Sequence, residues 1–278
     1  MIRIRIWHAT SSPTEAGLVE RACESYLNAD ERVRADRFRQ PTSRNQHVIG
    51  RGMARRLIGE HAGIDPTQIR FDLEPYGKPF VCDPPQAVRP FNVAHTHGLV
   101  LCGLFDTSRI EEGAAKVDSL DVGSGYFGSD HVGSDHVSSD HVTDRIKLGV
   151  DVEGLDRRTD PAIAERFFSQ PEIRYLQTQQ SDQSRRVAFL RIWTLKESFI
   201  KAIGTGMATP LADFAFEHID SDQPRIRMLS DKLDQGETWQ FRVFEPRPGY
   251  IAAAAVTMGE KTAVPNMLLH SFDELVDC

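Results

Sequence analysis

The stretch "IWTLKESFIKAIGTG", residues 192–206, contains the strongest helix pattern in the chain. Its apolar side chains cover much of a helical circumference, which indicates a buried helix. Gly204 is typical of the residue that ends such a helix. Trp193, Glu197 and Lys201 are four residues apart and share one stripe of the helix. Glu197 is therefore either half of a surface Glu–Lys pair or a buried carboxylate that needs partners from elsewhere in the chain.

Two more carboxylates lie upstream in "KLGVDVEGL", residues 147–155. The alternation predicts a strand with its apolar side chains on one face and Asp151 and Glu153 on the other. Two carboxylates close to a core repel each other unless a cation neutralises them or one takes up a proton. A hard divalent cation such as Mg²⁺ is one solution, and a solvated strand face is the alternative. A metal shared by Asp151, Glu153 and Glu197 would give Glu197 the partner it needs.

The remaining elements predict a mixture of helices and short strands. "SRNQHVIGRGMARRLIGEHAG", residues 43–63, is predicted to be a helix with a Ser43–Gln46 capping box and a stop at Gly63. "FNVAHTHGLVLCGLF", residues 91–105, indicates two strands interrupted between His95 and Gly98. The last pattern, "TWQFRVFEPRPGYIAAAAVTM", residues 238–258, indicates two strands joined by a Pro-Gly turn, the second one buried.

The composition is that of a soluble globular protein. The 278 residues are 40% hydrophobic and 26% charged. We expect no membrane span, because no apolar run approaches the ~20 residues that a bilayer requires. The first residues alternate charge and isoleucine, which predicts a strand rather than a signal peptide. Four scattered cysteines without a CxxC pair favour a reducing, cytoplasmic setting.

Charge is distributed unevenly. Residues 106–145 hold nine of the 40 acidic residues and only three bases, and they are rich in Gly and Ser, so we expect a disordered insert between two halves. The insert repeats "GSDHV GSDHV SSDHV" over residues 128–142, which reflects either repeat expansion or a metal-binding tract. Residues 32–56 instead hold eight arginines and one acid. This cluster favours a small phosphorylated ligand or an acidic partner over a long nucleic acid.

Two further segments carry a lysine or histidines at a predicted turn or strand end. Lys78 lies in "YGKP", residues 76–79, on a predicted tight turn. His95 and His97 alternate as strand residues do, but no cysteine or carboxylate stands near them at zinc-ligand spacing. A phosphate contact suits a histidine at a strand end near arginines better than a zinc site, whereas a hydrogen-bonded structural role fits His97 equally well.

Taken in order, these motifs resemble one family. "YGKP" (76–79), "FNVAH" (91–95), "GVDVE" (149–153), "WTLKESFIKAIGTGM" (193–207) and "PGYIAAAAV" (248–256) are similar to motifs of the surfactin-type, large monomeric 4′-phosphopantetheinyl transferases. The "RF" at 37–38 and "GRGMARRLI" at 50–58 resemble the family's N-terminal helix region. The resemblance covers nearly the whole chain except residues 106–145. It implies an α+β fold of two similar α/β halves, 1–105 and 146–278, related by a pseudo-twofold with the active site in the cleft between them.

The resemblance also implies an activity. Members move 4′-phosphopantetheine from coenzyme A to a serine of an apo carrier protein and release adenosine 3′,5′-bisphosphate. A cytoplasmic enzyme with no nucleic-acid or membrane partner is implied. A relative that binds coenzyme A or a carrier without catalysis is the alternative, although the retained acidic residues and Lys201 argue against it.

Carried over position by position, the resemblance implies specific roles. Mg²⁺ would be held by Asp151, Glu153 and Glu197. Glu197 would also act as the base, directly or through a metal-bound water, and Lys201 would contact the pyrophosphate. The nucleotide end of coenzyme A would be bound by Arg37, Lys78 and His95, with Arg51 as a further candidate. Ala94 stands where many relatives have serine, so one hydrogen bond to the nucleotide is expected to be missing.

Overall fold

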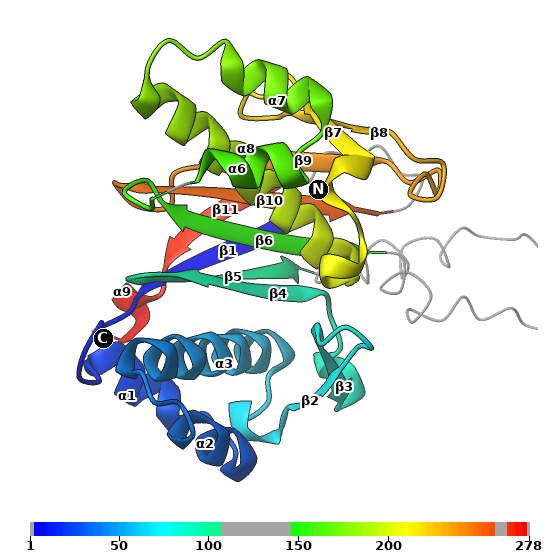
Figure 1. Cartoon of the computed structure of the whole chain (residues 1–278). Helices are drawn as coiled ribbons and strands as arrows, with labels where there is room; N and C mark the ends of the chain where they lie inside the picture. Colours follow the sequence, from blue (N-terminus) through cyan, green and yellow to red (C-terminus); the bar gives the residue numbers. More distant parts are fainter. Residues whose placement is uncertain (1–2, 107–145, 159, 259–265, 277–278) are drawn as a thin grey trace, which may run out of the picture.

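The computed structural model describes residues 3–106, 146–158, 160–258 and 266–276. The predicted insert therefore lies, apart from Asp106, outside the described residues, and so does the whole SDHV repeat. The described chain folds into four layers, in which two β-sheets face each other and each is covered on its outer side by helices (Figure 1). This α+β arrangement of two similar halves confirms the predicted fold class.

The first half is a four-stranded sheet covered by helices. The sheet has the order β11-β1-β5-β4. Its members are β1 (Arg3–Thr10), β4 (Phe91–Thr96), β5 (Leu99–Asp106) and β11 (Asn266–Ser271). Helix α3 (Pro41–Ala62) packs on the sheet's outer face, beside α1 (Leu18–Ser25) and α2 (Ala29–Asp36) (Figure 1). A small hairpin of β2 (Arg70–Leu73) and β3 (Pro79–Asp83) follows α3.

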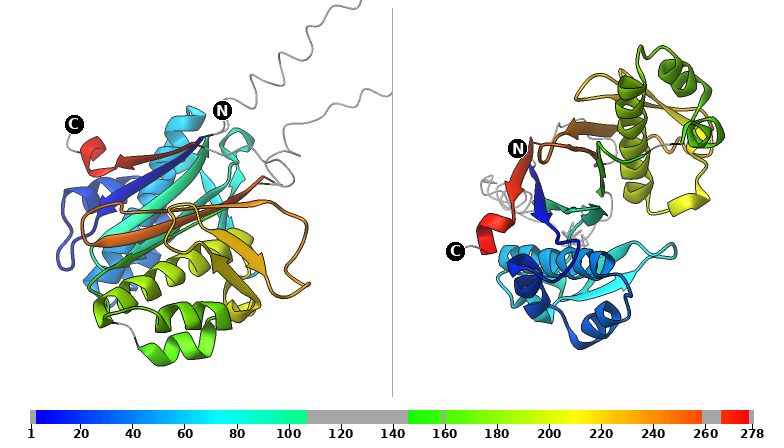
Figure 2. Two further views of the ribbon diagram at one scale, coloured as in Figure 1. Left: turned by 90° about the horizontal axis from the view of Figure 1, so that it is seen from above. Right: turned by 60° about the vertical axis from the view of Figure 1, so that its left-hand side comes forward.

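The second half repeats this plan with a three-stranded sheet in the order β6-β10-β9. Its strands are β6 (Lys147–Gly154), β9 (Trp239–Phe244) and β10 (Tyr250–Thr257). Helix α8 (Asp182–Ile203) covers the outer face, with α6 (Pro161–Phe167) and α7 (Gln170–Gln177) beyond it (Figures 1 and 2). A hairpin of β7 (Phe214–Glu217) and β8 (Arg225–Met228) follows α8.

The two sheets join the halves through an apolar core. Ile4, Ile6 and Leu101 of the first sheet meet Val150 and Val152 of the second, and all five are at most 2% exposed. Alternation along β6 makes this possible, because the even-numbered residues enter the core between the sheets while the odd-numbered ones face α8. The space between the ribbons is therefore filled with side chains where these strands overlap.

The last strand departs from the expected division of the chain. Residues 146–278 were assigned to the second half, but β11 pairs in parallel with β1 of the first sheet, from Arg3 opposite Asn266 to His8 opposite Ser271. The short helix α9 (Asp273–Val276) follows on the same half, where Asp273 accepts hydrogen bonds from Thr10. The segment therefore completes the edge of β1, a placement that its local pattern did not predict.

The helix ends show what local sequence predicts and where it misleads. Gly63 and Gly204 end α3 and α8 in the left-handed conformation, with φ of 67° and 72°, as predicted. The Ser43–Gln46 capping box is wrong, because α3 begins at Pro41 with Gln40 as its N-cap and Ser43 lies inside the helix. A proline suits the first turn of a helix, where its missing N–H costs nothing.

The central helix α8 is anchored by a buried lysine. Lys196 is fully buried, and its Nζ lies 2.8 Å from the equally buried Glu172 of α7. The same ammonium donates to the carbonyl oxygens of Leu211 at 2.7 Å and Phe214 at 2.8 Å. Glu172 in turn accepts hydrogen bonds from Ser169 and from the backbone of β7. This network joins α7, α8 and β7 into one unit.

Candidate active site

A glycine sets the distance between α8 and the acidic face of β6. Gly149 lies directly under the helix, and a Cβ at this position would overlap the carbonyl oxygen of Ser198 and the backbone nitrogen of Ala202. Only glycine permits so close an approach. The contact brings the half-buried stripe Trp193–Glu197–Lys201 against the face of β6 that carries Asp151 and Glu153.

Asp151 and Lys201 form the centre of this arrangement. The Nζ of Lys201 donates to Asp151 Oδ1 at 2.6 Å. The other oxygen, Oδ2, is buried and has no hydrogen-bond partner among the described residues. Burial raises the pKa of Asp151, and the positive charge of Lys201 opposes this shift. Lys201 therefore satisfies only Oδ1 of this buried carboxylate, and Oδ2 lacks a partner in the described residues.

Glu197 adds a second carboxylate to the same place. Burial raises the pKa of Glu197, and the negative charge of Asp151 raises it further, while Lys201 acts in the opposite direction. The two acids are therefore close enough to repel each other. The prediction that Glu197 lies on the inward-facing stripe of the helix is consistent with these interactions.

Glu153 lies on the same face but has other partners. Its Oε1 forms an ion pair with Arg157, and its Oε2 accepts a hydrogen bond from Thr96 at 3.4 Å. Within the described parts of the chain, no group of three or more His, Cys, Asp or Glu side chains has the arrangement of a metal site. Asp151 and Glu153 thus lie on one face of β6 and Glu197 on the stripe of α8 that faces it, with Glu153 bound to a guanidinium.

The chemistry of this group fits a magnesium ion at two of the three predicted positions. Asp151 and Glu197 offer hard carboxylate oxygens, and Asp151 Oδ2 has no hydrogen-bond partner in the described ranges that would compete with a cation. Mg²⁺ commonly binds one or two carboxylates, retains several waters and takes up phosphate oxygens. Glu153 can offer its Oε1 to such an ion only if the contact with Arg157 is released.

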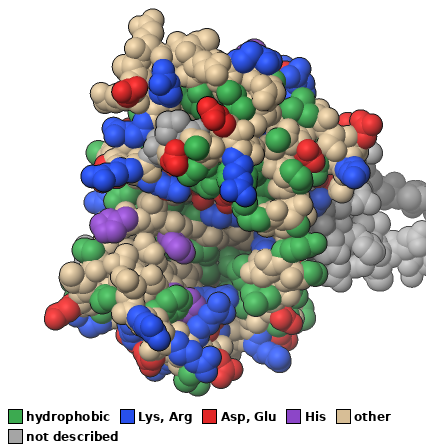
Figure 3. Space-filling model, viewed as in Figure 1, with side chains coloured by type: hydrophobic (Ala, Val, Ile, Leu, Met, Phe, Trp, Pro, Cys, Tyr) green, Lys and Arg blue, Asp and Glu red, His purple; other side chains and the backbone are tan. Residues whose placement is uncertain are grey.

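A basic pocket opens beside the carboxylates. It has a volume of about 380 Å³, lies between α3 and β4, and is lined by Arg34, Phe38, His47, Arg51, Phe91 and His95 among others. Part of the His95 ring faces solvent, yet burial in the pocket wall lowers its pKa and the charge of Lys201 lowers it further. Thr96, the next residue on β4, donates to Glu153, so this end of β4 connects the pocket with the carboxylates. Figure 3 shows the hollow between the two halves, with histidine and basic side chains around it.

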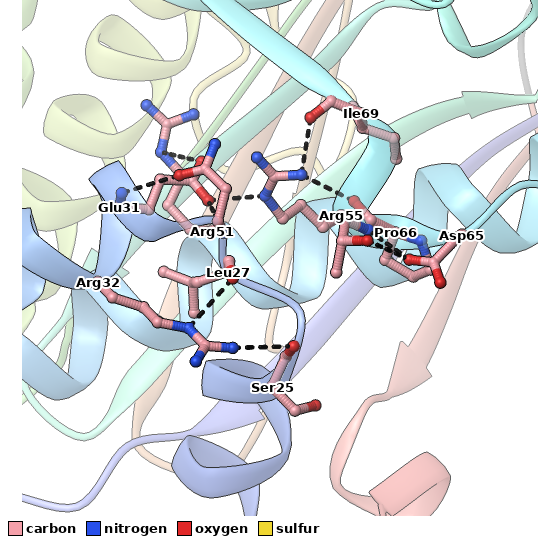
Figure 4. A network of polar contacts seen from close by, with 11 residues as sticks. Ser25, Leu27, Glu31, Arg32, Arg51, Arg55, Asp65, Pro66 and Ile69 are labelled. Atoms are coloured by element: carbon pink, nitrogen blue, oxygen red, sulfur yellow. Dashed lines mark hydrogen bonds and ion pairs between the residues drawn. The ribbon is translucent and has the colours of Figure 1, made fainter.

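Arg51 lies at the wall of this pocket and contacts an acid and an aromatic ring. Its guanidinium lies 3.9 Å from Glu31 and 5.1 Å from the centre of the Phe71 ring. The same carboxylate binds the fully buried Arg55 at 2.7 Å, and Arg55 donates to the carbonyl oxygens of Pro66 and Ile69 (Figure 4). Arg51 therefore lies between an acid that Arg55 anchors and an aromatic ring.

Two pocket residues, Arg34 and His47, were not among the predicted site residues. Burial and the nearby charges of Arg51 and Arg34 lower the pKa of His47 to about 4, so its ring is neutral at pH 7. Its Nε2 is buried and finds no hydrogen-bond partner in the described ranges. Both residues fall within the arginine-rich segment 32–56, and that cluster was the only sequence signal that could have indicated them.

The sequence comparisons agree with this geometry. Residues 147–255 match the family model of the 4′-phosphopantetheinyl transferase superfamily, and residues 12–103 match the model of the N-terminal part of 4′-phosphopantetheinyl transferases. The chain belongs to the 4′-phosphopantetheinyl transferase superfamily.

Relatives align with the transferase over nearly its whole length. The 4′-phosphopantetheinyl transferase HetI of Nostoc sp. is 27% identical over 91% of this chain and 87% of its own. The 4′-phosphopantetheinyl transferase Sfp of Bacillus subtilis is 26% identical over 91% of both chains. The holo-[acyl-carrier-protein] synthase of Helicobacter pylori, solved with coenzyme A, is 21% identical over 40% of this chain and 98% of its own, with a TM-score of 0.31.

Three residues of the transferase occupy places that the motifs did not indicate. Lys78 donates from Nζ to the carbonyl oxygens of Ala202 at 2.8 Å and Leu148 at 3.3 Å, and burial lowers its pKa to about 8. It lines an adjoining cavity of about 390 Å³ between the halves, which shares Pro79 and Phe91 with the basic pocket. Arg37 lines a neighbouring surface pocket with Arg34. The side chain of Ala94 lies in the core between the sheets.

None of the helices in the described ranges of the transferase is long and apolar enough to cross a membrane. The three described cysteines, Cys23, Cys82 and Cys102, carry free thiols.

Proposed function

We propose that this enzyme transfers 4′-phosphopantetheine from coenzyme A to a serine of an apo carrier protein, with the residues of the basic pocket and of the β6–α8 face in the roles given below. The products are the holo carrier and adenosine 3′,5′-bisphosphate. The observation that carries the proposal is the contact between the two parts of the site. His95 lines the pocket, and Thr96, the next residue on β4, donates to Glu153 at 3.4 Å, on the β6 face where Lys201 is bonded to Asp151.

The pocket suits the nucleotide end of the donor. Coenzyme A carries a 3′-phosphate and a diphosphate. Hydrogen-bond donors for such groups are offered in the lining of this one pocket by Arg34, Arg51 and His95. His47 is neutral, so it contributes a hydrogen bond rather than a charge. Arg37 can assist from the adjoining pocket, whereas Lys78 supports the site from the contact between the halves.

The reacting groups lie between α8 and β6. The hydroxyl oxygen of the carrier serine forms a bond to the phosphorus that bears the pantetheine. The bond from that phosphorus to the bridging oxygen breaks, and adenosine 3′,5′-bisphosphate leaves with this oxygen. Glu197 accepts the hydroxyl proton, a role for which burial suits it by raising its pKa. Lys201 neutralises the charge that develops on the diphosphate.

Asp151, Glu197 and Glu153 would hold Mg²⁺ in this scheme. When bound, the ion supplies Lewis-acid neutralisation of the diphosphate oxygens. The unpartnered Asp151 Oδ2 supports this assignment. We further propose that the enzyme acts in the cytoplasm as a monomer. The free thiols of the three described cysteines support the compartment and do not bear on the oligomeric state.

A carrier panel tests the function. The purified protein, coenzyme A and Mg²⁺ are incubated with apo carriers of the fatty acid, polyketide, nonribosomal peptide and lysine-pathway types. We expect at least one carrier to gain the mass of one 4′-phosphopantetheine group in mass spectrometry. No gain on any carrier, together with tight coenzyme A binding in calorimetry, would instead favour the alternative of a non-catalytic relative.

The pocket assignment predicts the effect of replacing Arg34 with alanine. Loss of a charge-assisted hydrogen bond costs about 1.5–3 kcal/mol, so the Kd for coenzyme A should rise by roughly 10-fold to 100-fold. The rate at saturating coenzyme A should change little, because this contact is made in the ground state and the transition state alike. Calorimetry and steady-state kinetics measure the two effects.

Arg32→Ala is the matched control for this variant. Arg32 lies on the same helix, but its guanidinium donates to the carbonyl oxygens of Leu27 and Ser25 (Figure 4). We expect its Kd for coenzyme A to remain near that of the wild type. Equal effects of the two substitutions would show that general positive charge, rather than the pocket, attracts the ligand.

A further inference from the structure

Arg157 is a cation next to the proposed metal ligands that the mechanism above does not use. It follows β6 in a turn that is closed by a hydrogen bond from its own N–H to the carbonyl oxygen of Gly154. Its guanidinium forms the ion pair with Glu153 and lies 5.6 Å from the centre of the Trp193 ring. It therefore covers the same stripe of α8 that carries Glu197 and Lys201.

The charge of Arg157 acts on all three proposed ligands. It binds Glu153 directly. Burial raises the pKa of Asp151 and of Glu197, and Arg157 counteracts both shifts after the larger effect of Lys201. The three carboxylates thus face two resident cations, and one of these, Arg157, holds Oε1 of Glu153, an oxygen that a third metal ligand would supply.

The two partners of the ion pair differ in their access to solvent. The Arg157 side chain is 41% exposed, whereas the Glu153 side chain is 11% exposed. The guanidinium can therefore move into water or remain against Trp193, where a cation–π contact is available. Glu153 cannot leave in the same way, because it lies on the buried face of β6 and also accepts from Thr96.

We propose that Arg157 is a resident competitor of the divalent cation, which holds Glu153 in the metal-free enzyme and releases it when the ion binds. The inference rests on the metal site in the proposed function. The guanidinium and a divalent ion cannot both occupy Oε1 of Glu153, and Oε2 already accepts from Thr96, so part of the binding free energy of the ion goes into separating the pair. Arg157 would thereby weaken metal binding and adjust it to the concentration of the ion.

The inference is tested by metal binding without coenzyme A or carrier. Mn²⁺ serves as the probe, because it binds oxygen ligands as Mg²⁺ does and its free form is measured by electron paramagnetic resonance. Arg157→Ala should bind Mn²⁺ about 10-fold or more tightly than the wild type, since one charge-assisted hydrogen bond no longer has to be broken. Arg157→Lys, which keeps the charge, should lie between the two.

Two controls separate displacement from a general effect of charge. Arg158→Ala removes the neighbouring charge, which lines a different pocket between α6, α7 and α8, and should leave the Mn²⁺ affinity near that of the wild type. In a Glu153→Gln background, Arg157→Ala should gain little, because the carboxylate that it would free is gone. Arg157→Gln gives the same comparison should the alanine variant fail to fold, as judged by circular dichroism.

The outcomes distinguish this inference from the function beneath it. If the wild type binds Mn²⁺ and Arg157→Ala binds it equally or more weakly, the inference about Arg157 is overturned while the proposed metal site is not. A full gain in the Glu153→Gln background overturns it in the same way. Mn²⁺ binding that survives both Asp151→Asn and Glu197→Gln, or no binding by any variant, overturns the proposed metal site as well.

Discussion

Replacing Glu197 with glutamine is expected to lower the rate of transfer to a carrier by at least roughly 10²–10⁴-fold, the usual contribution of a positioned general base. The substitution keeps the size of the side chain, so the packing of α8 on β6 is preserved. It removes the proton acceptor and one proposed magnesium ligand at once. Single-turnover transfer to an apo carrier, followed by mass spectrometry, measures the effect.

The matched control is Glu217→Gln on β7, whose carboxylate forms a half-exposed ion pair with Arg227 at 3.3 Å. It should transfer at the wild-type rate, because the pair lies on the β7–β8 hairpin and not on the β6–α8 face. A wild-type rate in Glu197→Gln would refute both assigned roles. Loss of transfer with unchanged Mn²⁺ binding would retain the base and remove Glu197 from the metal ligands.

Replacing Lys196 with methionine is expected to destabilise the fold by about 3–5 kcal/mol, the usual cost of removing one partner from a buried ion pair. Methionine fills a similar volume, so the loss is mainly electrostatic. Glu172 would remain buried without its counter-ion, and the carbonyl oxygens of Leu211 and Phe214 would lose their donor. Urea unfolding, compared at unchanged slope, measures the free energy of unfolding.

A second substitution tests the reason for this loss. Lys196→Met combined with Glu172→Gln should recover part of the lost stability, because no charge is then left in the core. Arg185→Met removes a cation from the same helix but from an exposed pair with Asp182 at 3.5 Å, and should cost at most about 1 kcal/mol. Equal losses from Lys196 and Arg185 would contradict the buried-pair interpretation.

Much of the fold could be predicted because its patterns are local. The stops at Gly63 and Gly204 depend on a left-handed residue at a helix end. The alternation in β6 and the buried strand β10 follow from the two-residue period of a strand. The start of α3 was missed because two local signals competed, and Pro41 determined the boundary rather than Ser43.

For the candidate site, the sequence predicted which helix or strand face carries each side chain, but not which side chains contact each other. The sequence placed Glu197 and Lys201 on one stripe and Asp151 and Glu153 on one strand face, and the structure brings these two surfaces together. It could not indicate that Arg34 and His47 point into the pocket. It also could not show that Lys78 binds carbonyl oxygens of the other half, because these partners are 70 and 124 residues away along the chain.

By itself, the sequence determined the order of the motifs, the helical stripe, the acidic strand face and hence the family. Tertiary structure alone decided which cation meets which acid: Lys196 meets Glu172, Lys201 meets Asp151, and Arg157 meets Glu153. It also decided that β11 returns to β1. The physical reason is that periodicity fixes the direction of a side chain relative to its own backbone. Its partner depends on how closely distant segments pack, as Gly149 sets the approach of α8 to β6.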